Sequence, residues 1–197
     1  VQLIDVHLES TFDDTRTYTA DADIIFDYTP YGAVDKTVHF ILDGKELTSA
    51  TVSANVSGSL VKYNLPKQKH GSHLLEVYIT AKINDIDVES NHIFKDILWY
   101  DDNSSDPVIG TVLQRFTARQ YDTTNIVYTV YDPLHENPDV KIYVDGKIVS
   151  SLTLEEPTNT YGYNTNNVGE HTIKIVCGKT EKVIEATIEK LDIDISP

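Results

Sequence analysis

Apolar and polar residues alternate along most of this chain, and the 3.6-residue spacing of a helix is nowhere sustained. Alternation with a period of two is the pattern of a strand with one buried face. The first half is predicted to form strands at 3–10, 24–28, 37–42, 51–56, 60–64, 73–83 and 88–100. The second half is predicted to form strands at 109–118, 125–131, 140–144, 150–154, 161–165, 171–177 and 183–188. About seven short strands in each hundred residues favour an all-β fold of immunoglobulin-like sandwiches.

The two halves of the chain share two sequence landmarks. The segment TVHFILDGK at 37–45 returns as DVKIYVDGK at 139–147, which is 102 residues later (37 to 139). A Gly-x-His triplet follows each copy, and the second triplet lies 98 residues after the first (71 to 169). The offsets differ only by the length of a loop, so the chain is interpreted as tandem copies of one module. The predicted organisation is a domain at 1–100, a linker at 101–106 and a second domain at 107–197.

Both landmarks have a structural interpretation. The Asp-Gly pairs at 43–44 and 145–146 supply the positive φ angles of a type I′ turn, so each predicts a tight hairpin. One exposed carboxylate per turn is too few for a calcium ion. The glycine of each Gly-x-His triplet turns the chain into the next strand, and the histidine is expected at the margin of the sheet. Zinc is not expected, because the histidines show no ligand spacing apart from the isolated pair His70 and His73.

Composition and charge narrow the classes of partner. Tyr occurs 12 times and Trp once, which together with abundant Thr, Val and Ile suits pleated sheets. The formal net charge is −15, from 31 acidic and 16 basic residues spread over both copies. Such a surface repels phosphate, so neither nucleic acid nor an anionic membrane surface is an expected partner. No stretch approaches the roughly 18 apolar residues of a membrane span, so no membrane insertion is expected. The negative charge is interpreted as a feature that keeps the protein soluble. The alternative interpretation is a surface that binds cations or basic proteins.

The rare residue types add two expectations. Cys177 is the only cysteine, so no intramolecular disulfide is expected, and it is interpreted as a small buried apolar residue. No His or Asn lies at a spacing from Cys177 that would make its thiol a catalytic nucleophile. The chain contains no Met, which predicts that it is a piece of a longer parent polypeptide or a processed product.

The linker is rich in Asp, Asn and Ser and is followed by Pro107. It resembles the linkers of cadherins, in which calcium rigidifies tandem domains. That resemblance makes Asp101, Asp102, Asn103 and Asp106 the candidate calcium ligands. These four residues offer fewer oxygens than the six to eight that calcium takes, and neither copy carries the other acidic motifs of cadherins. A solvated linker is the preferred interpretation, and no cofactor is expected.

The combined landmarks also resemble a known group of modules. Tyr-Thr-Pro at 28–30 and Tyr-Asp-Pro at 131–133 precede the Asp-Gly-Lys and Gly-x-His motifs in the two copies. This pattern resembles tandem immunoglobulin-like modules of bacteria and bacteriophages, and the junction ILWYDDNSSDPVIG is similar to linkers in long virion proteins of tailed phages. The resemblance implies a virion component, in a tail, fibre, muzzle or capsid decoration, with other virion proteins as partners. It implies no catalytic residues.

The sequence bears on three candidate functions. The first is a non-enzymatic structural and docking protein of the virion. The second is a bacterial cell-surface adhesin or carbohydrate-binding module, in which Tyr161, Tyr163 and Asn164 contact a cell-surface glycan. Because the two Tyr alternate with Gly162 in a strand, core packing is the competing interpretation for them. The third is an enzyme, which is not expected because no nucleophile, base and orienting group occur together. A Lys–Asn isopeptide crosslink, as in some surface modules, would appear as a lost ammonia in the intact mass.

Overall fold

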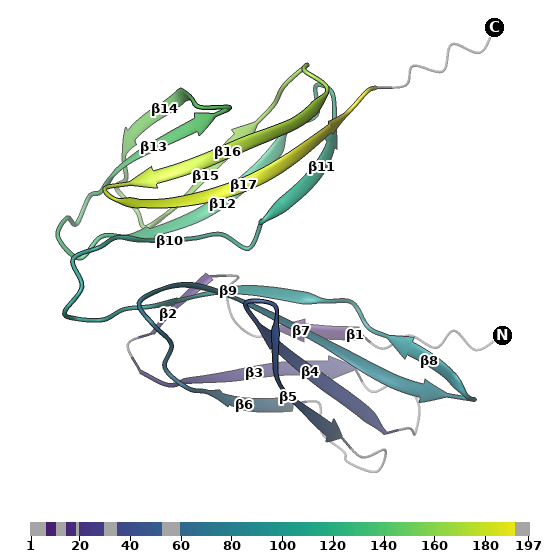
Figure 1. The fold of residues 1–197 in the computed structure, drawn as a ribbon. Coiled ribbons are helices and arrows are strands. Elements are labelled where there is room, and N and C mark those ends of the chain that lie inside the picture. The colour runs from purple at the N-terminus through teal and green to yellow at the C-terminus, as the bar shows by residue number, and fades with distance from the viewer. Residues whose placement is uncertain (1–6, 11–14, 19, 30–34, 53–59, 192–197) are drawn as a thin grey trace, which may run out of the picture. The chain divides into compact units, whose positions relative to one another are not determined.

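Both halves of the chain fold into β-structure (Figure 1) in a computed structural model that describes residues 7–10, 15–18, 20–29, 35–52 and 60–191. The chain divides into two units, Val1–Asp101 and Asp102–Pro197, here called unit 1 and unit 2. The described residues form strands β1 to β17 and contain no helix. A helical segment long and apolar enough to cross a membrane is therefore absent from this described part.

Unit 2 consists of two facing sheets. Its strands are β10 (Val108–Gly110), β11 (Arg115–Arg119), β12 (Thr124–Tyr131), β13 (Asp139–Val144), β14 (Lys147–Thr153), β15 (Thr158–Tyr163), β16 (Gly169–Cys177) and β17 (Thr180–Glu189). One sheet has the order β10-β12-β15 and the other the order β11-β17-β16-β13-β14. Alternate residues of both sheets point inward, for example Ile126 and Tyr128 on β12 and Ile173 and Ile175 on β16, and they form one buried cluster. This is the core that the alternating pattern requires.

Unit 1 repeats this plan. Its strands are β1 (His7–Ser10), β2 (Thr15–Tyr18), β3 (Ala22–Thr29), β4 (Lys36–Leu42), β5 (Lys45–Val52), β6 (Leu60–Leu65), β7 (Gly71–Ile83), β8 (Ile86–Glu89) and β9 (Ile93–Trp99). One sheet has the order β1-β3-β6 and the other β2-β9-β7-β4-β5, with β8 paired to β7. The inward residues of the larger sheet include Phe40, Val77 and Trp99, all buried. The prediction of an all-β fold of immunoglobulin-like sandwiches is confirmed.

The strand count differs from the prediction of about seven per unit. The predicted strand at 109–118 is two strands, because the chain leaves one sheet after β10 and joins the other as β11, which runs parallel to β17. The Thr111 hydroxyl group bonds the Val127 carbonyl and fixes this crossing. Likewise, 88–100 divides into β8 and β9. Alternation is interrupted at both places, by the pairs Val112-Leu113 and Gln114-Arg115 and by the polar run at 89–92, so the prediction joined separate strands across gaps in the pattern.

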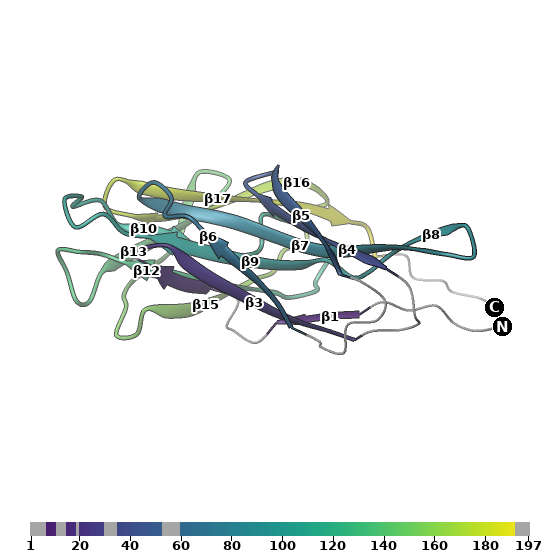
Figure 2. The ribbon, with the colours of Figure 1, turned by 90° about the horizontal axis from the view of Figure 1, so that it is seen from below.

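The predicted hairpin turns are confirmed. Asp43 and Gly44 have φ angles of 51° and 78°, and Asp145 and Gly146 have 49° and 78°. These are the two positive angles of a type I′ turn, and they join β4 to β5 and β13 to β14. A third turn of positive φ, at Asn84 and Asp85, joins β7 to β8. The pairing of β4 with β7 ends at Ala81, so β7 runs on and returns as β8 in an arm (Figures 1 and 2).

Candidate functional site

The Asp-Gly turn and the Gly-x-His triplet are joined in each unit. In unit 1, the His73 ring lies between the Asp43 carboxylate, 2.7 Å from Nδ1, and the Lys69 carbonyl, 2.9 Å from Nε2. The second carboxylate oxygen of Asp43 accepts the backbone N–H of Leu74 at 2.9 Å. A hairpin turn and a strand entry about thirty residues apart are thus tied by one carboxylate and one imidazole. We call this arrangement the Asp–His lock.

Unit 2 contains the same lock with nearly the same distances. His171 lies 2.7 Å from Asp145 and 2.8 Å from the Asn167 carbonyl, and Asp145 also accepts the N–H of Thr172. Both partners of the ring are acceptors, so both ring nitrogens must carry protons. The hydrogen bond to Asp145 accordingly raises the pKa of His171, and the same bond lowers the pKa of Asp145. The duplicated landmarks are structural parts of each unit.

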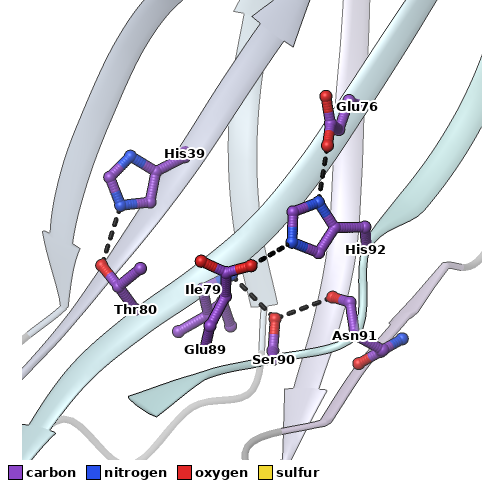
Figure 3. Close-up of polar contacts among 8 residues, drawn as sticks. All are labelled: His39, Glu76, Ile79, Thr80, Glu89, Ser90, Asn91 and His92. Atoms are coloured by element: carbon purple, nitrogen blue, oxygen red, sulfur yellow. Dashed lines mark hydrogen bonds and ion pairs between the residues drawn. The ribbon is translucent and has the colours of Figure 1, made fainter. Parts of the chain in front are cut away.

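In unit 1, a bulge at Ser90–His92 separates β8, the returning strand of the arm, from β9. Ser90 lies between β8 and β9, where its hydroxyl group accepts the backbone N–H of Ile79 at 2.8 Å and donates to the Asn91 carbonyl at 2.8 Å (Figure 3). The Ser90 N–H bonds the Ile79 carbonyl. One side chain therefore replaces a backbone partner, and the chain can bulge without leaving a buried N–H unpaired.

The bulge directs His92 onto the outer face of the sheet. There its Nδ1 lies 2.5 Å from Glu76 and its Nε2 lies 2.6 Å from Glu89 (Figure 3). Partial burial opposes protonation of this ring, but the two carboxylates outweigh it and raise the pKa of His92. His92 thus bridges two carboxylates through its two ring nitrogens, an arrangement that favours the protonated ring.

Aromatic rings continue this cluster across the sheet. Tyr78 stacks between His92, at a centroid distance of 4.3 Å, and His39, at 4.6 Å. His39 in turn contacts Thr80 and Glu46, each at 2.8 Å. Burial, helped by the nearby glutamates, raises the pKa of Tyr78, so its hydroxyl group is neutral. The outer face of unit 1 therefore carries an ordered row of rings and carboxylates from β4, β5, β7, β8 and the bulge.

A hollow of about 550 Å³ adjoins this row at the base of the arm. Thr80 and Glu89 belong to both the row and the hollow. The remaining lining comes from the start of β4 and from the arm: Asp35, Thr37, Ala81, Lys82, Asp87 and Val88. Three carboxylates and one ammonium group line the hollow, so its character is acidic.

Unit 2 lacks this site at the equivalent positions. The strand register places Lys174 where unit 1 has Glu76, and Glu181 where it has His92. These two residues form an ion pair with Nζ and Oε1 3.3 Å apart. The cross-strand pair is retained with its charges reversed. In place of the bulge, β17 pairs with β16 residue by residue from Thr180 to Ile188.

The three residues predicted to contact a glycan differ in how far they are buried. Tyr163 is only 2% exposed and packs edge-on against Phe116, so its ring belongs to the core. Tyr161 is partly buried against the same core, and burial raises its pKa. Asn164 is exposed, and its amide group donates to the Tyr121 carbonyl at 2.7 Å. The three residues do not form one open platform.

The candidate calcium ligands lie between β9 and β10. Asp101, Asp102, Asn103 and Asp106 are all exposed. The backbone N–H of Asp101 donates to His70, and that of Asp106 donates to Ser104. Throughout the described residues, no three His, Cys, Asp or Glu side chains come together in a group that could hold a metal ion. Cys177 is buried, and burial, helped by nearby acidic residues, raises its pKa to about 11.

Sequence reasoning did not find the row of rings or its bulge. The residues come from β4, β5, β7, β8 and the bulge, and neither their spacing nor a motif connects them. One signal was available: at matched positions after the Gly-x-His triplets, the two copies exchange Glu76 for Lys174.

No family model and no curated protein matches this chain. Among solved structures, the chain is similar to fibronectin(III)-like modules of Clostridium thermocellum CbhA, with 18% identity, coverage of 98% of this chain and 99% of the other, and a TM-score of 0.39. It is also similar to a chimeric titin Z1Z2 tandem, with 16% identity, coverage of 94% and 96%, and a TM-score of 0.35. A match to Bacteroides uniformis β-glucuronidase 3, with 9% identity and a TM-score of 0.39, covers 92% of this chain but only 24% of the enzyme.

Proposed function

We propose that this chain is a non-enzymatic spacer and docking unit of a tailed-phage virion component, in a tail, fibre, muzzle or capsid decoration. One observation carries the proposal: the two units keep the same frame and differ on their outer faces. The Asp–His lock recurs almost unchanged, whereas Glu76 and His92 are replaced by Lys174 and Glu181. A repeated frame with divergent faces suits modules that set a spacing and contact different neighbours.

The sheet edges support a docking role. Within the described strands, β14 is an end strand of its sheet, so one side of its backbone is open to pairing. Its residues Ile148 and Val149 are about half exposed, at a bulge that repeats the one beside Leu47 in β5. Other virion proteins or a larger parent polypeptide are the proposed partners.

The alternative function is a bacterial cell-surface adhesin that binds a glycan. The partly exposed Tyr161 and the exposed Asn164 are the residues that favour it. A glycan array with the intact chain and with Tyr161→Ala tests this alternative. Binding that Tyr161→Ala abolishes would favour the adhesin, and the absence of binding by the intact chain would exclude it. Tyr163→Ala is unsuitable here, because it would open a cavity in the core.

Immunogold labelling tests the proposed function directly. Antibodies against the purified chain are applied to a culture that contains both the phage and its host, and particles are examined by electron microscopy. Gold on the particles at a regular position is the expected result. Gold confined to the surface of the bacterial cells would contradict the virion assignment and support the adhesin.

A further inference from the structure

Three glutamates on the outer face of unit 1 each hold a histidine through a single oxygen. Glu46 uses Oε1 for His39, and Glu76 and Glu89 use Oε1 for His92. Within the described residues, the second oxygen of each carboxylate accepts no further hydrogen bond. An ionised carboxylate accepts up to about four hydrogen bonds. The cluster therefore retains acceptors in fixed positions that a donor from outside can reach.

Asp87 adds a carboxylate that is not engaged by this cluster. It is exposed on the arm, where it lines the acidic hollow beside Glu89. The described residues give Asp87 no hydrogen bond or ion pair. The strand register pairs it with Lys82, whose long side chain reaches solvent. We call Glu46, Glu76, Asp87 and Glu89 together the acidic face.

An exposed aromatic ring stands at one border of the acidic face. Phe94 is 41% exposed and lies directly opposite Glu76 in the register of β7 and β9. Ile86, 61% exposed, marks the tip of the arm. The Phe94 ring is stacked near His92, with the ring centroids 6.4 Å apart. Its exposed part beside a carboxylate suits a guanidinium group, which stacks on the ring while its N–H groups bond the carboxylate. A lysine ammonium group matches this pair less well, because it is a point charge without a flat face.

Unit 2 lacks this combination at the matched positions. Lys174 and Val183 occupy the register positions of Glu76 and Phe94, so a cation and an aliphatic side chain replace the carboxylate and the ring. Unit 2 is therefore a control within the same molecule, with the same frame and a similar density of acidic residues.

We propose that the acidic face and Phe94 form a docking surface for an arginine-bearing segment of a partner protein. The inference rests on the proposed docking function and assigns it a surface and a partner chemistry. Charge complementarity supplies the attraction, and the ring and the fixed carboxylates select arginine.

The test uses the whole chain labelled with ¹⁵N and a short peptide that alternates arginine with serine. The expected result is a set of saturable amide shifts confined to unit 1, at β7, β8 and the Ser90–His92 bulge. Peptides with lysine in place of arginine are expected to bind about fivefold more weakly, and peptides with glutamate are expected not to bind. Equal shifts over both units would reveal attraction by net charge alone and would overturn the inference.

Variants at matched positions in the two units show which side chains contribute to the affinity for the arginine peptide. Phe94→Ala and Asp87→Asn are each expected to weaken binding of the arginine peptide about threefold to fivefold. Their controls in unit 2, Val183→Ala and Glu181→Gln, are expected to leave affinity unchanged. Amide spectra of the variants show that each one folds. Equal effects of the two sets would contradict the proposed surface.

The experiment also separates this inference from the proposed function. Gold on the virions together with no peptide binding would contradict the proposed docking surface and leave the proposed virion function supported. Peptide binding at the acidic face together with gold only on bacterial cells would support the proposed docking surface and contradict the virion assignment.

Discussion

A histidine placed between two acceptors behaves differently from a histidine in water. In the Asp–His lock of unit 2, His171 must donate from both ring nitrogens, and Asp145 must accept from the ring and from the Thr172 N–H. Each group therefore stabilises the charged form of the other. Since the lock joins the β13–β14 turn to the start of β16, the protonation of one side chain bears on the stability of the unit.

The pH dependence of unit 2 follows from these two shifts. His171 has a raised pKa, so its contribution is complete below the unfolded value of about 6.5 and is lost as the pH rises through the folded value. Asp145 has a lowered pKa, so its contribution is present above about 4 and is lost as the pH falls through the folded value. The lock is therefore strongest between about pH 4 and pH 6.5.

The variant His171→Gln tests this window. The wild-type protein is expected to exceed the variant in free energy of unfolding by roughly 1 kcal/mol more near pH 5.5 than near pH 8.5, after allowance for the exposure of Asp145. Urea unfolding of unit 2, followed by its NMR peaks, is the measurement. A difference that does not change with pH would mean that the ring acts only by packing.

At the scale of elements, the Ser90–His92 bulge creates the site on unit 1. Without it, β8 and β9 would form one continuous strand like β17, and His92 would occupy an ordinary ladder position. The bulge is stable because the Ser90 hydroxyl group bonds the Ile79 N–H and is itself buried. One hydroxyl group thus determines where the imidazole lies.

Removing that hydroxyl group is expected to destabilise unit 1. Ser90→Ala leaves the buried Ile79 N–H without a partner, which costs about 1 to 3 kcal/mol. Urea unfolding followed by the fluorescence of Trp99, the only tryptophan, measures this loss because Trp99 is buried in unit 1. The control Lys82→Ala, on the exposed side of the same arm, should change stability by less than about 0.5 kcal/mol. Equal effects would indicate that the bulge does not depend on Ser90.

At the scale of the whole chain, the two cores differ in composition. The buried face of the larger unit 1 sheet includes two lysines, Lys36 beside Val38 and Lys95 beside Ile97. The core cluster of unit 2 is entirely uncharged. Burying an ammonium group costs free energy even when it is paired, so unit 1 is expected to be the less stable unit.

Two single-copy residues report on the two units separately. Trp99 reports on unit 1, and the buried thiol of Cys177 reports on unit 2. The Cys177 pKa of about 11, raised chiefly by burial, and its lack of exposure predict that the native thiol does not react near pH 8. In urea, the Trp99 fluorescence transition is expected at a lower concentration than the onset of Cys177 labelling. Coincident transitions would show that the chain unfolds as one cooperative unit.

Features that depend on near neighbours could be derived from the amino-acid sequence. A period of two defined the strands, the Asp-Gly pairs defined the hairpins, and the repeat of 37–45 at 139–147 indicated a duplicated module. The all-β fold and the hairpins are confirmed, because backbone geometry and the burial of alternate side chains are local constraints. The predicted strands ran through the sheet change after β10 and through the bulge at Ser90, although alternation is interrupted at both places, because which sheet a strand joins depends on distant partners.

The contacts between residues far apart in the chain became apparent in the folded protein. It joined Asp43 to His73 across about thirty residues, placed Tyr163 in the core, and stacked Tyr78 between His39 and His92. The physical reason is that a sheet brings strands together by backbone pairing, and the register of that pairing sets which side chains face one another. The duplication is a prediction from the sequence alone, whereas the acidic face lies where three strands of unit 1 and a bulge converge.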